Sequence, residues 1–276
     1  MATGKTDSGV GFDPGVLDRV ERRFWAEIWG SVPAAVAAEQ GIELRRFGPV
    51  QVSLVRALPG AQIPNLVLGA TVPGALDGPL EAALEWVESA GARCYVPVNP
   101  GMAASAGAED LLRARGYEPA YPWMKFVRDA HEPRFEAPAG VEVVELDGSS
   151  QEPFGMIAAT GFGLPAWAAS FFAGLPGRDG WRCYLARVEG TAAACAAMLV
   201  DGETAELGVA ATLEPARGHG CQLALLRRRI LDAGAAGCRT LFVETGARTP
   251  GRPAASYRNI LRAGFEEAYL RPNWRR

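Results

Sequence analysis

The sequence contains few of the side chains from which a metal centre or a catalytic triad is built. Its 276 residues include only two histidines, His131 and His219, and its five cysteines are widely spaced, with no Cys-x-x-Cys pair. A zinc site, a disulfide framework and a Ser-His-Asp triad are therefore not expected. Scattered thiols suit a reducing compartment, so we expect a cytoplasmic protein without a bound metal.

Long apolar segments are also missing. The longest uninterrupted apolar stretch, 192–200, is too short to span a bilayer, and residues 1–11 lack the apolar core of a signal peptide. The net charge of −3 does not provide the positive field that a general nucleic-acid binder needs. We therefore expect neither a membrane nor a nucleic acid as a partner, and nothing in the sequence indicates an oligomeric state. What the chain does have is 49% hydrophobic residues, enough for a sizeable core.

An internal repeat divides the chain in two. When Gly116 is aligned with Gly264, the neighbouring residues match without a gap. The first copy reads Leu112, Gly116, Tyr117, Glu118, Ala120 and Tyr121, and the second reads Ile260, Gly264, Phe265, Glu266, Ala268 and Tyr269. A period this long indicates a duplicated domain rather than a solenoid, whose repeats are about 20–50 residues long. The Pro-containing segment 129–140 is the natural linker, so we expect domains at 1–134 and 135–276.

Apolar periodicity predicts a similar mixture of elements in both halves. One helix carries Leu17, Val20, Phe24 and Ile28 on a single face. Further helices are expected at 80–90, 108–115, 221–233 and 254–263, with shorter helical stretches up to Ile157 and at 167–172. Strands are expected at 51–58, 65–72, 93–98, 141–146, 182–188, 192–200, 204–212 and 240–245, with one more near the end. The fold class is therefore α+β, with two tandem domains that each hold a mostly antiparallel sheet flanked by helices.

A glycine-rich loop between an expected strand and an expected helix carries the strongest chemical signal. It contains Arg217, Gly218, His219 and Gly220, and Cys221 follows. Glycines let the backbone turn tightly and expose N–H groups, and the helix N-terminus adds partial positive charge, so the loop suits a phosphate anion. It is not a Rossmann fingerprint, because the third glycine of that motif is absent. It is not a P-loop either, because no Lys-Ser or Lys-Thr pair follows the glycines. A plain tight turn before a helix is the other interpretation of the same residues.

The region around this loop is basic, although the whole chain is acidic. From Pro215 onward there are twelve arginines and four acidic residues. This concentration around a phosphate loop indicates a polyphosphorylated ligand. The three arginines at 227–229 equally suit a solvated helix face.

The order of elements in the second half resembles the GNAT family of N-acetyltransferases. The similarity covers the strand at 209–212, the loop motif at 217–220, the helix after it, the strand at 241–244, the helix near 256 and the Gly-Phe pair at 264–265. The repeated Gly116-Tyr117 pair suggests that the first half resembles a degenerate GNAT-like domain, as in tandem GNAT proteins. The resemblance implies an enzyme that uses acetyl-CoA as its acyl donor.

The resemblance also implies where acetyl-CoA binds. A strand edge would pair with the pantetheine arm, and a strand N–H near Ala211 would bind the thioester oxygen as negative charge develops on it. The loop N–H groups would hold the pyrophosphate. The implied cofactor-binding set is Ala210, Ala211, Thr212, Arg217, Gly218, His219, Gly220, Cys221, Gln222 and Ser256.

Three positions depart from the family's pattern. Gln222 stands where the last glycine of the loop is usual, and Pro215 stands where a Gln or Arg is usual. Ile260 occupies the position of the tyrosine that protonates the departing thiolate. Tyr257, on a neighbouring face of the same helix, is a candidate substitute; a water molecule as the acid and a purely structural Tyr257 are the alternatives.

Two carboxylates are candidates for the base that accepts the proton of the amine. Glu206 and Glu244 lie on the two expected central strands, where side chains alternate between the two faces of the sheet, so at most one or two of these faces can point into a cleft. A surface position without a catalytic role is the other interpretation of each residue. Cys221, at a helix N-terminus, is expected to have a lowered thiol pKa. No histidine or acid lies at helical spacing to activate that thiol, so a structural role is preferred. His219 is expected to be exposed above the phosphates.

The leading function is therefore an N-acyltransferase. It would move an acetyl or other short acyl group from acyl-CoA to a primary amine of a small molecule or short peptide, by direct attack in a ternary complex. The alternative is a catalytically silent CoA-binding sensor or interaction module, which Ile260 and the altered loop favour. In the first half, Pro73 lacks an N–H and Asp77 would repel phosphate, so we expect no CoA there.

Overall fold

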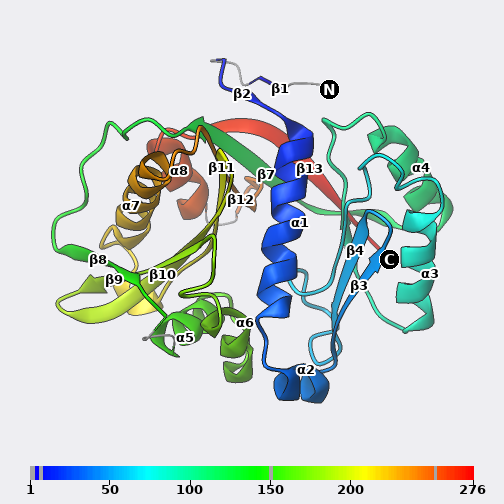
Figure 1. Cartoon of the computed structure of the whole chain (residues 1–276), viewed down its shortest axis with the longest axis horizontal. Coiled ribbons are helices and arrows are strands. Elements are labelled where there is room, and N and C mark those ends of the chain that lie inside the picture. The colour runs from blue at the N-terminus through cyan, green and yellow to red at the C-terminus, as the bar shows by residue number, and fades with distance from the viewer. Residues whose placement is uncertain (1–3, 6–8, 149–151, 252–253) are drawn as a thin grey trace. The chain divides into compact units, whose positions relative to one another are not determined.

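The computed structural model describes residues 4–5, 9–148, 152–251 and 254–276 (Figure 1). The chain divides into two compact units. Unit 1 consists of Met1–Lys125 and Ala268–Arg276, and unit 2 consists of Phe126–Glu267. The division falls after Lys125 rather than near residue 135, and the C-terminal segment belongs to the first unit. Among the described residues, no helix has both the length and the apolarity needed to cross a bilayer.

Unit 1 is built on the strand order β3-β4-β5-β6-β13. Neighbouring strands are antiparallel except for β5 and β6, which are parallel. The strands are β3 (Ile42–Phe47), β4 (Val50–Val55), β5 (Leu66–Leu68), β6 (Tyr95–Pro97) and β13 (Glu266–Arg275), and the helices are α1 (Pro14–Gly30), α2 (Ala34–Gln40), α3 (Pro79–Ser89) and α4 (Ser105–Ala114). A short pair of strands, β1 (Gly4–Lys5) and β2 (Gly11–Phe12), precedes α1.

Helix α1 begins and packs as its sequence predicts. Asp13 caps the helix by accepting a hydrogen bond from the Gly15 N–H at 2.8 Å, and Pro14 stands at the first helical position, where an N–H would have no helical partner. The predicted apolar face within 17–28 is buried. A separate apolar core joins α3 and α4 to β4 and β6, and it includes Trp274 of β13.

Unit 2 repeats the same plan with the strand order β12-β11-β10-β9-β8. Its neighbouring strands are antiparallel except for β11 and β12, which are parallel. The strands are β8 (Val141–Leu146), β9 (Trp181–Val188), β10 (Thr191–Asp201), β11 (Thr204–Thr212) and β12 (Thr240–Gly246), and the helices are α5 (Glu152–Gly161), η1 (Ala166–Ala169), α6 (Ser170–Ala173), η2 (Glu214–Ala216), α7 (Cys221–Ala235) and α8 (Ala255–Arg262). Both units thus have a mostly antiparallel sheet flanked by helices, which confirms the predicted α+β class.

The core of unit 2 lies between α7 and the strands β9 and β10. Leu225 and Cys221 of α7 pack against a row of buried alanines on β10. Small side chains on the strand let the helix approach the sheet closely, because no bulky group stands between them. The five cysteines of the chain are all buried thiols.

Two strands begin in one unit and end in the other. Strand β7 (Glu118–Asp129) runs from unit 1 into unit 2, and β13 runs from unit 2 into unit 1. Each follows one copy of the repeat, after Gly116 or Gly264, whose positive φ angles end the preceding helix. Each half of the sequence therefore completes the unit that is formed mainly by the other half.

The segment 129–140, expected as a linker, packs within unit 2 instead. The Nε atom of Arg227 on α7 donates to the carbonyl of Phe135 at 2.9 Å. Helix α2 and strand β3 were not predicted from the sequence. Among the described strands, β3 pairs only with β4, and it exposes charged side chains, so it lacks the apolar alternation that reveals a strand buried on one face.

A buried charge cluster joins α1 to the two crossing strands inside unit 1. Arg271 of β13 donates to both carboxylate oxygens of Glu21, one of them at 2.6 Å, and Lys125 of β7 lies 3.1 Å from the same carboxylate. All three side chains are almost fully buried. Burial alone would raise the pKa of Glu21, but the Arg271 and Lys125 cations outweigh it and lower that pKa to about 2.

We expect the Glu21→Gln substitution to destabilise the protein at pH 7 by about 3–5 kcal/mol, because two buried cations lose their shared carboxylate. Since the pKa of Glu21 in the folded protein lies below its ordinary value of 4.5, its contribution to stability is complete above pH 4.5 and is lost as the pH falls towards about 2. The difference in the free energy of unfolding between wild type and Glu21→Gln should therefore become smaller at acidic pH. Urea unfolding at pH 7 and pH 3 measures both effects.

The control for this prediction is Glu81→Gln, which removes an exposed carboxylate that pairs with Arg115 at the surface of the same unit. That variant should stay within about 1 kcal/mol of wild type at both pH values. If wild type and Glu21→Gln differed by the same free energy of unfolding at pH 7 and at pH 3, the acid-sensitive part of the stability would not come from Glu21.

Candidate active site

The parallel strands β11 and β12 separate in the middle of unit 2. They pair only over residues 204–207 and 240–243, while β11 continues to Thr212 with β10 on its other side. Along residues 208–212, therefore, no described strand pairs with the edge of β11 that faced β12. The backbone groups on that edge are available to an extended ligand, which can add to a sheet edge as another strand does.

A β-bulge in β11 lies at the same point. Ala197 of β10 pairs with Gly208 and Cys195 pairs with Ala211, so two residues of β11 oppose one residue of β10. Val209 has a φ angle of +45°, a conformation that β-branched residues seldom adopt. The Cys195 thiol contacts the Val209 carbonyl at 3.8 Å. The bulge redirects the backbone just before the expected pantetheine residues at 210–212.

Helix α5 packs directly against this part of β11. A Cβ atom added at Gly161 would lie 2.4 Å from the Cβ of Ala211, a distance at which real atoms cannot remain. Glycine at position 161 thus permits the close approach of the helix to the strand. Ala211 is buried as a result, whereas Ala210 and Thr212 are partly exposed.

The glycine-rich loop connects the end of β11 to α7. Gly218 and Gly220 have φ angles of +91° and +84°, and Gly220 directly precedes the helix. The first N–H that bonds to this loop from within the helix is that of Ala224, which donates to the Gly220 carbonyl at 3.0 Å. The N–H groups of residues 221–223 precede it and have no carbonyl of their own helix to bond. This arrangement is the anion-binding geometry of a helix N-terminus.

The side chain at the atypical loop position links the two helices beyond the loop. The Nε2 atom of Gln222 donates to the Ser256 hydroxyl at 2.9 Å, and its Oε1 atom accepts from Asn259 at 2.9 Å. The structure thus brings Gln222 and Ser256, both in the predicted binding set, into direct contact. Asn259, which completes the link, was not predicted. Its helical spacing from Ser256 was the only available signal.

Exposure differs between the remaining loop residues. Arg217, Gly218 and His219 are exposed, as a surface anion site requires, whereas Cys221 is buried. Burial raises the pKa of the Cys221 thiol, so the expectation of a lowered pKa at the helix N-terminus is wrong. Desolvation of the thiolate outweighs the helix dipole here. Cys221 is a packing residue of the unit 2 core.

The candidate bases lie on one face of the sheet. Glu206 on β11 pairs in register with Phe242 of β12, and Glu244 lies two residues beyond Phe242. Because side chains two residues apart point to the same face of a strand, the two carboxylates share a face. Glu206 is buried within the paired region, and Glu244 is partly exposed just after the strands separate. Their roles as bases stay a prediction.

Tyr257 of α8 is buried and hydrogen-bonded. Its hydroxyl donates to Glu267 at 2.5 Å, the guanidinium of Arg248 lies over its ring at 4.3 Å, and Phe126 packs edge-on at 4.7 Å. Burial and the bond to Glu267 both raise the pKa of the hydroxyl. Ile260, at the position of the usual tyrosine, is buried in the same helix. Whether Tyr257 serves as the acid therefore stays a prediction.

One arginine of the run 227–229 differs from the other two. Arg227 and Arg228 form ion pairs with surface carboxylates, as a solvated face predicts, but Arg229 is only 1% exposed. The expectation that all three lie on a solvated face is wrong for Arg229. Its position four residues after Leu225 and next to Ile230, both on the apolar face of α7, was a signal that identifies it as buried.

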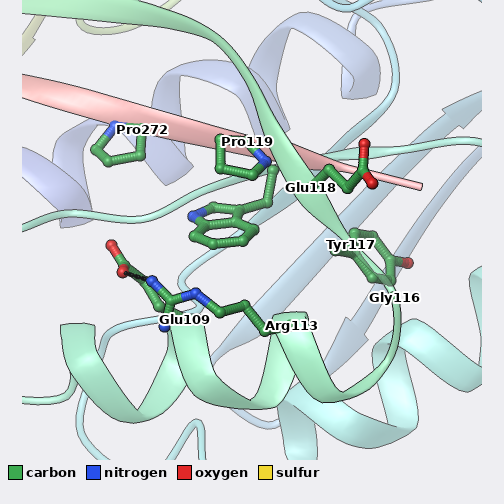
Figure 2. Close-up of a pocket in the computed structure, with 8 residues that line it drawn as sticks. Glu109, Arg113, Gly116, Tyr117, Glu118, Pro119 and Pro272 are labelled. Atoms are coloured by element: carbon green, nitrogen blue, oxygen red, sulfur yellow. Dashed lines mark hydrogen bonds and ion pairs between the residues drawn. The ribbon is translucent and has the colours of Figure 1, made fainter.

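A surface hollow in unit 1 is not part of this site. It has a volume of about 590 Å³ and lies beside Gly116 and Tyr117, between α4 and the strands β7 and β13. Arg113 and Glu109, one turn apart on α4, lie on one side of the hollow and form an ion pair (Figure 2), with 2.7 Å between their charged atoms. None of the predicted CoA residues lines this hollow. The glycine loop of unit 2, at the N-terminus of α7, therefore remains the better anion site.

Comparisons with known proteins identify the fold. No protein-family model and no curated protein matches the sequence. A GCN5-related N-acetyltransferase from Kribbella flavida is 16% identical, with a TM-score of 0.59 over 91% of this chain and 94% of that one. One from Sphaerobacter thermophilus is 16% identical, with a TM-score of 0.58 over 83% and 80%. A tandem GNAT protein from the clavulanic acid biosynthesis pathway is 18% identical, with a TM-score of 0.57 over 82% and 78%. The chain has the fold of these proteins, one of which is named as a tandem GNAT protein, in agreement with the resemblance seen in the sequence.

Proposed function

We propose that this protein is an N-acyltransferase that moves an acetyl or other short acyl group from acyl-CoA to a primary amine of a small molecule or short peptide. The observation that carries the proposal is the opening between β11 and β12 beside the bulge, followed directly by the glycine loop at the N-terminus of α7. A strand edge for an extended arm and a nest for a diphosphate thus occur in the order in which CoA presents those groups.

The residues of unit 2 suit acyl-CoA along its length. The open edge at residues 210–212 would pair with the amides of pantetheine, and the N–H groups at residues 217–222 would hold the pyrophosphate. Arg217 is exposed at the loop and adds a cation. Ser256, held by Gln222, would lie at the nucleotide end of the cofactor. Acyl-CoA supplies an acyl carbon that an amine can attack directly, so no covalent enzyme intermediate is required.

Direct attack of the amine on the acyl carbon requires three contributions from the protein. Glu206 or Glu244 would accept the proton that the amine loses as the N–C bond forms. A strand N–H near Ala211 would stabilise the negative charge on the carbonyl oxygen. As the C–S bond breaks, the thiolate would take a proton from Tyr257 or from water. The proton count then balances, with one proton lost by the amine and one gained by the thiol.

Unit 1 would support this site without binding CoA. The positions that correspond to the glycine loop hold Pro73 and Asp77, which offer neither a full set of N–H groups nor a positive field. Inside the same unit, the buried Glu21 carboxylate is taken up by Lys125 and Arg271. The domain that binds acyl-CoA would thus be the second, and the cytoplasmic location stays a prediction from cysteine usage.

The test combines binding with turnover. Calorimetry with CoA should give one site per chain, and two equivalent sites would contradict the assignment of binding to unit 2 alone. Release of free thiol from acetyl-CoA is then followed across a panel of primary amines. Amine-dependent release supports the acyltransferase, and failure to bind CoA at all overturns the proposal.

The second candidate is a CoA-binding sensor without turnover. The observation in its favour is that Ile260 replaces the usual acid, while the Tyr257 hydroxyl is directed to Glu267. Tight binding of CoA combined with no thiol release for any amine would support the sensor.

If Tyr257 is the acid, Tyr257→Phe should lower the catalytic rate by about 100-fold with little change in CoA affinity. The effect should shrink with an acyl donor whose thiolate leaves easily, because that thiolate needs no proton. Steady-state kinetics with both donors measures this. The matched control is Tyr184→Phe, which removes another buried hydroxyl bonded to a carboxylate, that of Asp232 at 2.8 Å. Equal rates for wild type and Tyr257→Phe would leave water as the acid.

A further inference from the structure

A buried arginine lies beside the bulge of β11. Arg229 of α7 is 1% exposed, and among the described residues no carboxylate pairs with it. Removing a cation from water without a counter-ion is costly, so hydrogen bonds must replace its hydration. Its neighbour Arg228, in contrast, pairs with Asp232 at the surface. Arg229 therefore does not serve as a solvated surface charge, and its burial requires another explanation.

Backbone carbonyls take the place of the missing counter-ion. The Nη1 atom of Arg229 donates to the Ala197 carbonyl at 3.0 Å and to the Gly208 carbonyl at 3.4 Å, and its Nε atom donates to Leu225 in its own helix at 3.1 Å. Ala197 and Gly208 are the last paired residues before the bulge. One guanidinium thus holds both strands at the position where the regular ladder stops.

The contact with Gly208 also fixes the direction of the next N–H group. The Gly208 carbonyl and the Val209 N–H belong to one peptide unit, and in a trans peptide these two groups point in opposite directions. With the carbonyl directed at Arg229, the Val209 N–H is directed away from it. A cation on the carbonyl also polarises the peptide, which strengthens the N–H as a donor.

The Arg229 guanidinium, whose charge polarises the peptide, stays protonated at neutral pH. Burial lowers the pKa of the Arg229 guanidinium to about 10, so the group remains protonated under ordinary conditions. Other ionisable groups face it from the packed strands: the hydroxyl of Tyr184 on β9 and the thiol of Cys195 on β10. Burial raises the pKa of the Tyr184 hydroxyl and raises the pKa of the Cys195 thiol to about 12, so both stay neutral while Arg229 is charged.

We propose that Arg229 is a positioning residue that holds and polarises the Gly208–Val209 peptide, so that the Val209 N–H donates to the acyl carbonyl of bound acyl-CoA. The inference rests on the proposed function, because it needs acyl-CoA on the open edge of β11. It adds a source of positive charge to that site from a residue that never touches the substrate. Arg229 would therefore affect recognition of the carbonyl but leave the pyrophosphate loop unchanged.

The experiment compares two ligands that differ only in the carbonyl. Acetyl-CoA has it, and S-ethyl-CoA, a thioether of nearly the same size, lacks it. By calorimetry, wild type should bind acetyl-CoA about tenfold more tightly than S-ethyl-CoA, the value of one good hydrogen bond from a polarised peptide N–H. Arg229→Gln, which keeps an amide donor for the carbonyls but loses the charge, should bind the two ligands within about twofold of each other.

Two further variants separate positioning from packing. Arg229→Lys keeps the charge and should restore part of the preference for the carbonyl. Arg228→Gln removes a neighbouring charge at the surface of the same helix and should keep the full preference. Binding of S-ethyl-CoA should be the same for all variants, since it reports the contacts with pantetheine and the pyrophosphate but not with the carbonyl. If Arg229 had only a structural role, its substitution would instead weaken the binding of both ligands to the same extent.

The outcomes distinguish this inference from the proposed function. If wild type binds neither ligand, the proposed function fails. If wild type binds both ligands equally, or if Arg229→Gln keeps the tenfold preference, CoA binding stands and the role of Arg229 is overturned. Should Arg229→Gln not fold, the infrared stretch of ¹³C-labelled acetyl carbonyl bound to wild type decides. A shift to lower frequency on binding supports the hydrogen bond, and an unshifted band overturns it.

Discussion

Residues 135–276, expressed alone, are expected to remain largely unfolded and to bind no CoA. Residues 126–129 of β7 belong to unit 2, where Phe126 and Val127 are completely buried and Phe126 packs against Tyr257. Losing a buried Phe side chain alone costs about 3–5 kcal/mol, a large part of the stability of a typical domain. Circular dichroism and calorimetry with CoA measure the result.

The control for this fragment is the full chain cut at the same place. A protease site inserted after Arg134 would be cleaved in the folded protein, and both pieces should then remain together. Each piece supplies strands to both units, since 126–134 belong to unit 2 and Ala268–Arg276 belong to unit 1. The cut chain should therefore keep its CoA affinity. A separate fragment 135–276 with native secondary structure and native affinity would contradict the prediction.

Gly218→Asp is expected to weaken CoA binding by about 100-fold or more while leaving the fold intact. A Cβ at Gly218 meets no atom within 4 Å, whereas one at Gly220 would lie 2.6 Å from the Cβ of Pro138. A substitution at Gly220 would therefore disturb packing as well as binding. Two like charges about 4 Å apart repel by about 4 kcal/mol at an effective dielectric constant of 20, which accounts for the size of the effect.

Gly218→Asn is the matched control, because it has the same shape and the same strain at positive φ but no charge. It should weaken binding only a few-fold. Calorimetry gives the affinities, and thermal unfolding checks that both variants remain folded. If Asp and Asn weaken binding equally, the loop does not hold the phosphates.

Local signals in the sequence were sufficient for much of unit 2. Strands β8 and β11 have the predicted bounds, and α7 begins at Cys221 as predicted, because apolar alternation and glycine punctuation act over a few residues. The candidate loop follows from the same signals. The Gln222–Ser256–Asn259 link does not, since the partners lie on different helices and only the folded chain brings them together.

Long-range features of the site and the core could not be predicted. The contact between Glu21 and Arg271 joins opposite ends of the chain, and neither residue carries a local sign of burial. The separation of β11 from β12 coincides with the bulge at Val209, which no residue type in the strand indicates. The boundary near 135 was placed by proline content, whereas the two units divide within strand β7, after Lys125, and the prolines of that strand at 119 and 122 obscure its extended pattern.

The passage of β13 into unit 1 sets the order in which the chain can fold during synthesis. Arg271 and Trp274, which complete the charge cluster and the apolar core of unit 1, leave the ribosome only after all of unit 2 has been made. Until then, the first 125 residues lack the packing of Trp274 in their core and the pairing of Arg271 with Glu21. Contacts of such sequence separation slow folding and prolong the exposure of apolar surface. Chaperone dependence in the newly made chain is thus expected to concentrate on the N-terminal half, although the proposed active site lies in the other.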